Sequence, residues 1–428
     1  MIIERRGNYI LYIEKETGYW GIFPSNGEFP LNIEEDAKRK ILKIFREDFS
    51  NTLCLFIFHF AEGCNLKCKY CFANASVSGE GKVADSFILY EGIKKIARTS
   101  SPGIRVEFSA GEPLLHYKLI FKIIEEAISI FTNSNKNFDF HIQTNGTVLN
   151  NEIVNFLKKY SEPRVISIGI SADGPPEIHN RNRVFPNNRG SFEIVIKNMK
   201  RLCEAGIKFG ILSVVERPDE VEKIYNFWVN EGYSHIRLNP IFRAGRSKRI
   251  FSENEQKEFA YAELEIFRKS LKDGVFLQNV YYLLQNIILY ERPYMCLRSP
   301  CGAGISQICI NWDGDIYSCQ EFISSSNFVI GNILKCEDIE QLLLVSPIIK
   351  NLRNRTVENI NECKECVWKK FCGNSCAAKT YFFYGDYMRK NPFCTYYKTI
   401  FKELIWEIFF QKDKILEVYF KKYLKKGV

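Results

Sequence analysis

Six apolar runs that alternate with amphipathic segments limit the fold of this chain more than any other feature. Short apolar runs bounded by polar and turn residues are typical of buried strands, and apolar residues at helical spacing follow most of them. The expected strands are 53–60, 104–108, 138–143, 165–170, 208–215 and 235–239, and the expected helices include 117–131, 152–160, 192–204 and 220–230. Strand–helix alternation builds a parallel sheet through right-handed crossovers. The predicted fold class is therefore α/β, with fewer units than a closed eightfold barrel.

Three cysteines in the loop after the first expected strand, Cys64, Cys68 and Cys71, indicate a metal site. A four-iron cubane has four metal corners, so a loop with three thiolates leaves one iron open to a ligand that is not protein. Structural zinc sites and electron-transfer clusters normally take four protein ligands. The number of thiolates therefore favours chemistry at a cluster, and a zinc knuckle is the alternative.

The spacing of these cysteines resembles the signature of the radical S-adenosylmethionine (radical SAM) enzymes, and Tyr70 and Phe72 match the aromatic positions around the last cysteine. The resemblance implies a partial (β/α)6 barrel with its site at the strand ends. It also implies that the amino and carboxylate groups of SAM chelate the open iron. Reduction by a low-potential electron donor then yields a 5'-deoxyadenosyl radical, which abstracts a hydrogen from the substrate.

Residues at the ends of later strands match the SAM-binding positions of that family. Gly111 and Glu112 resemble its Gly-Gly-Glu-Pro motif, in which the carboxylate accepts hydrogen bonds from the SAM ammonium group. A turn capped by this acid is the alternative. The resemblance further implies polar contacts to SAM from Asn145, Ser171 and Asp173, and a carboxylate contact from Arg183 or else Arg181. It also implies an adenine contact from Leu238, for which core packing is the alternative. His59, within an apolar strand, is expected to be a core histidine.

A second cysteine-rich region resembles the SPASM extension that follows the barrel in many peptide-modifying radical SAM enzymes. It reads Cys301, twelve residues, Gly314, four residues, Cys319, then Cys363-x2-Cys366-x5-Cys372-x3-Cys376 and, after seventeen residues, Cys394. By this resemblance Cys296, Cys301, Cys319 and Cys376 hold one auxiliary [4Fe–4S] cluster, and Cys363, Cys366, Cys372 and Cys394 hold another. Without Cys296, the first of these would keep an open iron. A zinc ribbon on Cys363, Cys366, Cys372 and Cys376 is the alternative. The prediction is three [4Fe–4S] clusters.

The number of cysteines and the net charge further limit the class of protein. The fifteen cysteines are an odd number and cluster as metal ligands do, which favours a cytoplasmic chain with reduced thiols. Four lie outside both groups and are expected to be buried small apolar side chains: Cys54, Cys203, Cys309 and Cys336. No membrane partner is expected, since neither a signal pattern nor an apolar run of roughly 18 residues is present. The formal charge of +9 falls to roughly +4 once cluster charge is counted, and no nucleic-acid motif accompanies it.

Two enzymatic functions fit the resemblance. The leading hypothesis is maturation of a ribosomally made precursor peptide through a thioether or carbon–carbon cross-link, an oxidation for which auxiliary clusters provide electron acceptors. The rival is an anaerobic sulfatase-maturating enzyme, which forms formylglycine and commonly has an aspartate base after the cysteine of the Gly-x4-Cys element. Here Gln320 and then Glu321 follow Cys319, so Glu321 is the candidate base. A non-catalytic iron–sulfur redox sensor is the alternative of a different class.

The expected organisation has five parts. Residues 1–50 form a hairpin and a helix that either bind a leader peptide along a sheet edge or plug the barrel. The barrel spans 51–245, a bridge of two helices spans 246–292, the auxiliary-cluster domain spans 293–400, and a terminal helix spans 401–428.

Overall fold

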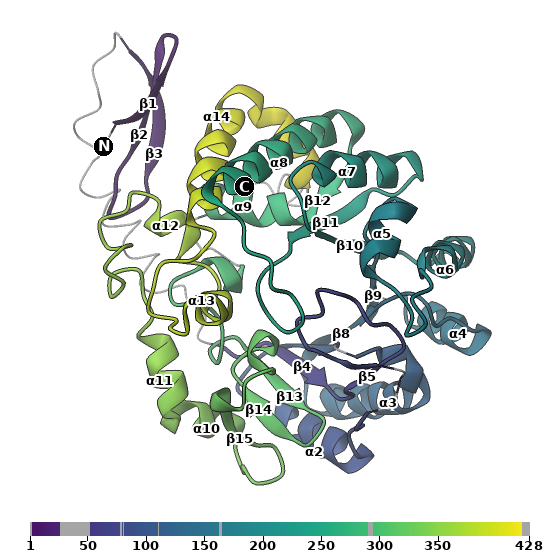
Figure 1. Ribbon diagram of the computed structural model, residues 1–428. Coiled ribbons are helices and arrows are strands. Elements are labelled where there is room, and N and C mark those ends of the chain that lie inside the picture. Colours follow the sequence, from purple (N-terminus) through teal and green to yellow (C-terminus); the bar gives the residue numbers. More distant parts are fainter. Residues whose placement is uncertain are drawn as a thin grey trace. The chain divides into compact units, whose positions relative to one another are not determined.

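A computed structural model describes residues 2–25, 52–77, 79, 81–109, 111–161, 165–289 and 294–421 of the chain. The chain divides into two compact units, and Figure 1 labels its helices and strands. Unit 1 comprises residues 1–51, 251–302 and 352–428, and unit 2 comprises residues 52–250 and 303–351. The helix expected over 33–46 lies outside the described residues, and the five-part division stays a prediction.

The parallel strands of unit 2 lie side by side in chain order. They are β4 (Leu55–His59), β7 (Gly103–Phe108), β8 (Asn137–Thr144), β9 (Ile166–Ser171), β10 (Phe209–Val215) and β11 (His235–Pro240). Every neighbouring pair in this series is parallel. Each apolar run of the sequence has thus become one strand, with bounds that shift by one or two residues. The predicted α/β fold with a partial barrel of parallel strands is confirmed.

Helices connect these strands and cover them on the outside, as Figure 1 shows for α3, α4 and α6. They are α2 (Ser86–Ala97), α3 (Tyr117–Asn133), α4 (Asn151–Lys159), α5 (Pro176–Asn182), α6 (Phe192–Glu204) and α7 (Glu220–Asn230). Side chains fix where two of them begin: Asp85 accepts from Phe87 N at 2.7 Å before α2, and Asn150 accepts from Ile153 N at 2.8 Å before α4. The crossovers therefore bring the carboxyl ends of all six strands to one edge of the sheet.

The sheet of unit 2 continues beyond β4 with strands from the second cysteine-rich region, which the sequence did not predict. β13 (Gln307–Asn311) pairs in parallel with β4, and the antiparallel strands β14 (Asp315–Tyr317) and β15 (Val329–Asn332) follow. α10 (Ile339–Val345) and α11 (Pro347–Arg353) come next. β13 satisfies backbone groups that β4 would otherwise leave unpaired at an edge. Residues that follow Cys301 in sequence are thus part of the barrel's own sheet.

Unit 1 contains a small antiparallel sheet and a set of helices. The sheet has the order β1 (Ile2–Arg6), β2 (Tyr9–Ile13) and β3 (Trp20–Pro24), which confirms the expected hairpin. The helices are α8 (Glu253–Asp273), α9 (Gln278–Ile288), α12 (Lys369–Cys372), α13 (Ala377–Tyr384) and α14 (Cys394–Tyr419). Ser252 and Glu255 form a capping box at the start of α8, and Gly274 ends it at φ 68°. Two helices between residues 251 and 292 were expected and are present.

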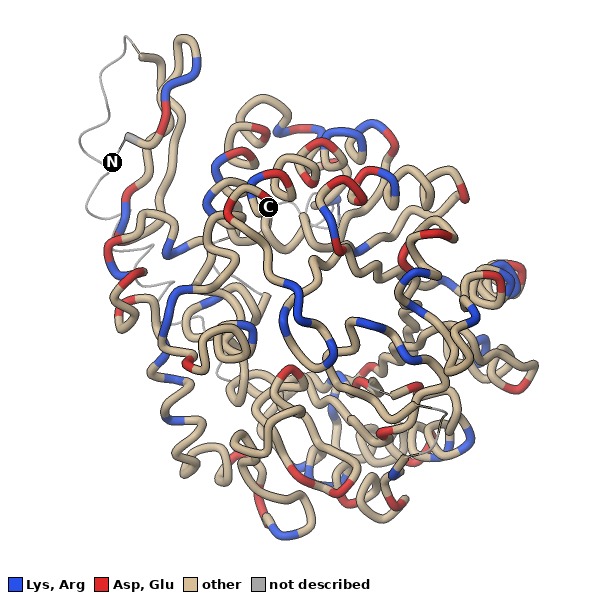
Figure 2. Tube along the Cα trace, in the orientation of Figure 1, with Lys and Arg blue, Asp and Glu red and all other residues tan. Residues whose placement is uncertain are grey.

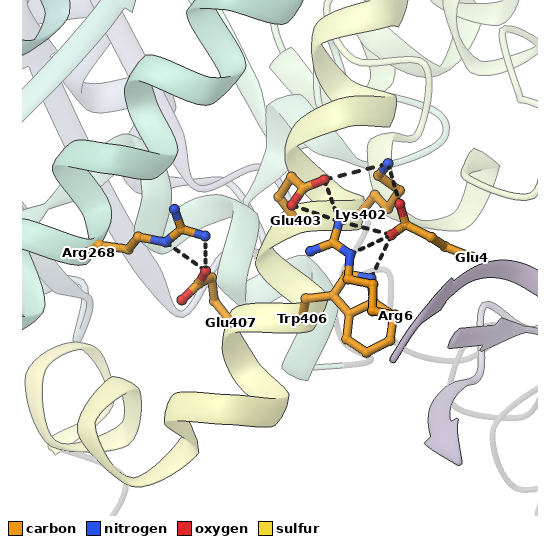
Figure 3. A network of polar contacts seen from close by, with 7 residues as sticks. All are labelled: Glu4, Arg6, Arg268, Lys402, Glu403, Trp406 and Glu407. Carbon is orange, nitrogen blue, oxygen red and sulfur yellow. Dashed lines mark hydrogen bonds and ion pairs between the residues drawn. The ribbon is translucent and has the colours of Figure 1, made fainter. Parts of the chain in front are cut away.

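Charged side chains fasten β1 to α14 within unit 1 (Figure 3). Arg6 donates to both carboxylate oxygens of Glu403 at 2.7 and 2.9 Å. Glu4 accepts from Lys402 Nζ at 3.1 Å and from the indole Nε1 of Trp406 at 2.8 Å. Because Trp406 is fully buried, this network joins the first strand to the apolar side of the last helix.

Two expectations from composition meet different outcomes. Cys309 is buried, and Cys54 and Cys336 are partly buried, but Cys203 is exposed. The prediction for Cys203 was wrong because it lies at the solvent-facing end of α6, where an amphipathic helix need not bury a small side chain. Among the described residues, no helix has both the length and the apolar character needed to cross a membrane.

Candidate active site and cluster ligands

The three cysteines of the loop after β4 converge on one another. The loop closes where β5 (Gly63–Cys64) pairs with β6 (Ser76–Val77). Cys64 packs with Leu66 and Ala75, and Cys68 and Cys71 pack against the same small cluster. Backbone N–H groups point at two of the sulfurs: Leu66 N donates to Cys64 Sγ at 3.4 Å and Ala75 N to Cys71 Sγ at 3.5 Å. Hydrogen bonds of this kind to thiolate sulfurs tune iron–sulfur clusters.

The chemistry of these thiols fits a bound metal cluster. Burial, with the charge of Glu112 second, raises the pKa of Cys64 to about 12, and burial raises the pKa of Cys68 to about 11. A coordinated metal supplies the positive charge that deprotonates such thiols. Within the described ranges, no group of three or more His, Cys, Asp or Glu side chains lies close enough to hold a single metal ion. The fit to a four-iron cubane therefore rests on the convergence of the thiols.

Gly111 lies against the cysteine loop so closely that only glycine fits. Its φ is +58°, and a Cβ there would stand 2.5 Å from the carbonyl oxygen of Gly63 and 2.7 Å from that of Ala61. The next residue donates its N–H to the same Gly63 carbonyl at 2.9 Å. The end of β7 and the cysteine loop are therefore fixed relative to each other through backbone atoms.

The carboxylate of Glu112 is fully buried and ties two strand ends together. It accepts from Leu114 N at 2.9 Å, from Thr144 Oγ1 at 2.6 Å and from Asn145 N at 2.7 Å. Burial raises the pKa of Glu112, and these three donors oppose that shift. The bond to Leu114 N caps the 3-10 helix Pro113–His116, as the capping alternative predicted. Contact with the SAM ammonium group stays a prediction.

Asn145 connects the end of β8 to the cysteine loop. Its Nδ2 donates to Asn65 Oδ1 at 2.9 Å and lies 3.7 Å from Cys64 Sγ. Its Oδ1 accepts from Thr147 N at 2.9 Å, which fixes the orientation of the amide. The side chain of Asn145 thus contacts the cysteine loop directly, and its contact with SAM stays a prediction.

Tyr70, Asp173 and Arg183 form a buried charged cluster. Tyr70 Oη donates to Asp173 Oδ2, and Arg183 Nε lies 3.0 Å from the same oxygen. The Arg183 guanidinium also lies over the Tyr70 ring, 5.3 Å from its centroid. Although burial opposes ionisation of Arg183, the charge of Asp173 raises its pKa, and burial raises the pKa of Tyr70 well above its usual value. Arg181 pairs instead with Glu220 at 2.7 Å and Glu216 at 3.2 Å.

The remaining expected site residues occupy less distinctive positions. Ser171, at the end of β9, accepts from Gln143 Nε2 at 2.9 Å. Leu238 is buried in β11, and Phe72 is half-buried in the cysteine loop. His59 is a buried histidine whose Nδ1 lies 2.7 Å from Asn311 Oδ1, and burial lowers its pKa.

Gly245 and Arg246 also contact the cysteine loop, and the sequence analysis missed them. Arg246 N donates to Cys71 O at 3.0 Å, and its guanidinium donates to Cys68 O at 3.3 Å and to Ala75 O. A Cβ on Gly245 would stand 2.2 Å from Cys71 O. Figure 2 shows basic residues along this loop after β11. The only signal in the sequence was a Gly-Arg pair within a basic stretch.

The residue that follows Cys319 faces the barrel motif. Gln320 Oε1 accepts from Ser109 Oγ at 2.9 Å, and Ser109 comes directly after β7. Glu321, the candidate base, donates its backbone N–H to Cys319 Sγ at 3.5 Å. The amide of Gln320 therefore contacts the strand end beside the Gly111–Glu112 motif.

In unit 1, four cysteines line one cavity together with Trp368 and Tyr397. They are the predicted ligands of one auxiliary cluster: Cys363, Cys366, Cys372 and Cys394. Burial raises the pKa of Cys363 and of Cys372 to about 12, so these thiols also need a metal to ionise. Cys376, which the zinc ribbon would require, does not line this cavity. The geometry supports the predicted set over the ribbon.

The other predicted auxiliary set is divided between the units. Cys296, Cys301 and Cys376 belong to unit 1, and Cys319 belongs to unit 2. Tyr397 interacts electrostatically with Cys376 and Cys296 as well as with Cys372. The four-member set, including ligation by Cys296, stays a prediction.

Comparison with known proteins identifies two domains. Residues 58–227 match the radical SAM superfamily, and residues 301–367 match the SPASM iron–sulfur cluster-binding domain. A cysteine-type anaerobic sulfatase-maturating enzyme of Clostridium novyi is 26% identical over 81% of this chain and 93% of its own length. The radical SAM cyclopropyl synthase TigE of Paramaledivibacter caminithermalis is 25% identical over 90% of this chain and 80% of its own.

Solved structures share the fold. Native anSMEcpe with bound AdoMet and the Cp18Cys peptide aligns with a TM-score of 0.72 at 21% identity, covering 85% of this chain and 99% of that one. Streptococcus suis SuiB bound to the precursor peptide SuiA aligns with a TM-score of 0.58 at 15% identity, covering 86% of this chain and 82% of that one. At this level of identity the likeness shows the fold alone.

Proposed function

Because the chain belongs to the radical SAM enzymes that carry a SPASM domain, we propose that it matures a ribosomally made precursor peptide by forming a thioether or carbon–carbon cross-link. These domains imply a [4Fe–4S] cluster and SAM. A total of three clusters is part of the proposal. When bound, SAM and its cluster supply the radical that removes a hydrogen atom from the peptide, and auxiliary clusters supply electron acceptors for the oxidation.

The chain's own residues prepare the site for this chemistry. Cys64, Cys68 and Cys71 would hold the cluster with one iron open, because no fourth protein thiol belongs to this loop. Glu112 and Asn145 fix the ends of β7 and β8 against the loop and present polar atoms to SAM. The reaction needs its reactive groups held in one geometry, and these buried, hydrogen-bonded side chains meet that need.

The observation that carries the choice of reaction is the side chain of Gln320. Formylglycine formation requires a group that takes a proton from the cysteine or serine being oxidised. The amide of Gln320 accepts a hydrogen bond from Ser109 at 2.9 Å but cannot accept a proton as a carboxylate does. A cross-linking maturase has no requirement for a carboxylate at this position, so Gln320 favours it.

The second candidate function is that of an anaerobic sulfatase-maturating enzyme. The likeness to the Clostridium novyi enzyme over most of both chains favours it, as does a carboxylate one residue later, at Glu321. Both functions use the same radical site and act on a side chain of a peptide or protein. They differ in the product.

The decisive experiment is mass spectrometry of a candidate peptide after anaerobic reaction with the reconstituted enzyme, SAM and a reductant. The proposal expects the peptide to lose the mass of two hydrogen atoms, to remain joined after proteolysis, and to be unreactive toward a hydrazide probe for aldehydes. A hydrazide-reactive product from a sulfatase peptide would establish the second function. Failure to form any 5'-deoxyadenosine would favour the redox sensor.

Matched variants sharpen this test. Gln320→Asp introduces a carboxylate at the position that contacts Ser109. Gln320→Asn is the matched control, because it places an amide of the same size as the aspartate there. If the chain is a cross-linking maturase, the two variants give the same cross-linked product, because cross-linking does not require a base at position 320. Aldehyde formation that rises in the aspartate variant alone would contradict the proposal.

A further inference from the structure

Arg355 is a fully buried cation with no carboxylate partner among the described residues. Its side chain is 1% exposed and lies in unit 1, two residues after α11. Its guanidinium donates to the carbonyl oxygens of Tyr387 at 2.7 Å, Ser375 at 3.1 Å and Asn374 at 3.2 Å, and to Thr380 Oγ1 at 3.2 Å. The described part of the chain thus gives Arg355 hydrogen-bond acceptors but no carboxylate.

An uncompensated buried charge costs several kcal/mol, so a compensating charge is expected nearby. The groups that interact electrostatically with Arg355 are four thiols: Cys301, Cys376, Cys363 and Cys372. Two of them belong to each predicted auxiliary set. As free thiols they are neutral, whereas as iron ligands they are thiolates of anionic clusters. Loading both clusters would therefore give Arg355 a negative charge that no carboxylate of the described residues provides.

Arg355 also holds a segment that is unfavourable on its own. Gly373, Asn374 and Ser375 follow one another with φ of 54°, 57° and 46°. Left-handed backbone is unfavourable for a residue with a side chain. Two of the Arg355 hydrogen bonds end on carbonyl oxygens of this segment, and Asn374 Oδ1 accepts from Asn391 N at 2.6 Å.

This segment joins Cys372 to Cys376, one proposed ligand of each auxiliary cluster. We propose that Arg355 is a positioning residue shared by both clusters: it fixes the 372–376 segment and raises the reduction potential of both. The sign follows from electrostatics, because reduction adds negative charge and a nearby cation stabilises the reduced form. This inference rests on the proposed pair of auxiliary clusters.

The test is a redox titration, followed by electron paramagnetic resonance, of the full chain without peptide. Cys64, Cys68 and Cys71 are replaced by alanine so that only auxiliary clusters remain. Arg355→Gln removes the charge, and Arg355→Lys keeps it while losing the planar fork. We expect Arg355→Gln to lower the reduction equilibrium constant of both clusters at least tenfold, which is 59 mV for one electron. Arg355→Lys shifts it by less than tenfold.

The control is Arg6→Gln, another arginine of unit 1, which pairs with Glu403 and should leave both potentials unchanged. Potentials in Arg355→Gln that equal those of the parent, or a shift of one cluster alone, overturn the inference. If the glutamine variant does not assemble its clusters, the lysine variant decides. The parent is the protein in which only Cys64, Cys68 and Cys71 are replaced. An Arg355→Lys variant with as much iron as the parent and similar reduction potentials supports the inference that the positive charge acts on both clusters. An Arg355→Lys variant with as little iron as Arg355→Gln refutes it.

Iron content separates this inference from the proposed function. The parent should hold about eight irons per chain if both auxiliary clusters are present. About four irons would refute the proposed pair of clusters itself. Eight irons with unchanged potentials in the variants would refute only the role of Arg355. No outcome depends on which peptide bond or cross-link the enzyme forms.

Discussion

Glu263, in the middle of α8, is a buried carboxyl group whose ionisation should set the pH dependence of stability. It is 1% exposed, and its neighbours are neutral: Tyr396 Oη donates to one oxygen and Asn279 Nδ2 to the other. Burial raises its pKa from 4.5 to about 7, against these two hydrogen bonds. Substituting Gln keeps the shape of the side chain and removes its ability to ionise.

The magnitude follows from the shift in pKa. A change from 4.5 to about 7 corresponds to about 3 kcal/mol. The folded chain binds more protons than the unfolded one between these values, so the free energy of unfolding falls as pH rises through this window. Glu263 therefore imposes no penalty below pH 4.5 and its full penalty above pH 7. About 2 kcal/mol of that penalty should develop between pH 5.5 and pH 8.5.

The assay is denaturant unfolding under anaerobic conditions, with wild type and Glu263→Gln compared across that range of pH. The difference between the two proteins cancels every group whose titration does not depend on Glu263, and burial raises the pKa of the neighbouring Tyr396 well above this range of pH. Glu263→Gln should become progressively more stable than wild type as pH rises. Glu265→Gln is the matched control, because Glu265 lies on the same helix with its side chain 58% exposed. Parallel pH profiles for Glu263→Gln and wild type, or a control that reproduces the change, would refute the reasoning.

Three further substitutions test the structure elsewhere. Gly111→Ala should abolish iron loading of the N-terminal cluster, measured by iron content and visible absorption, because the new Cβ would stand 2.5 Å from a backbone carbonyl oxygen. Arg183→Met leaves Asp173 buried without its cation, so the unfolding free energy should drop by about 3–5 kcal/mol; a drop below 1 kcal/mol would contradict a buried ion pair. Arg6→Met should lower the unfolding free energy by about 1 kcal/mol after allowance for partial exposure, and added salt should reduce the difference if the contact to Glu403 is electrostatic.

The fold of the barrel was largely determined by local pattern. The apolar runs that became β4 and β7 through β11 are long enough to be strands, and helical spacing between them requires crossovers. The meeting of three thiols in the loop after β4 could also be predicted, because their close spacing in one loop brings them together. Cys64, Cys68 and Cys71 lie close together in the sequence, and they pack around the same small cluster in the structure.

Contacts between segments that are far apart in the sequence could not be predicted from the sequence. Nothing local indicates that β13 pairs with β4, since an edge strand accepts any extended partner of suitable register. Arg246 contacts Cys68 across a sequence separation of 178 residues, and its role is visible only once the loop after β11 lies over the cysteine loop.

Arg355 shows the same limit most clearly. In the sequence it is one basic residue among 59, with no motif around it. Its burial, its hydrogen bonds to the left-handed segment and its nearness to four thiols all arise from packing. The sequence by itself determined the six alternating strands of the barrel and the place of the cysteine loop after the first of them, because these depend on local spacing. The tertiary structure alone decided which charges and backbone groups surround them, because burial and electrostatic partners depend on residues brought together by the fold.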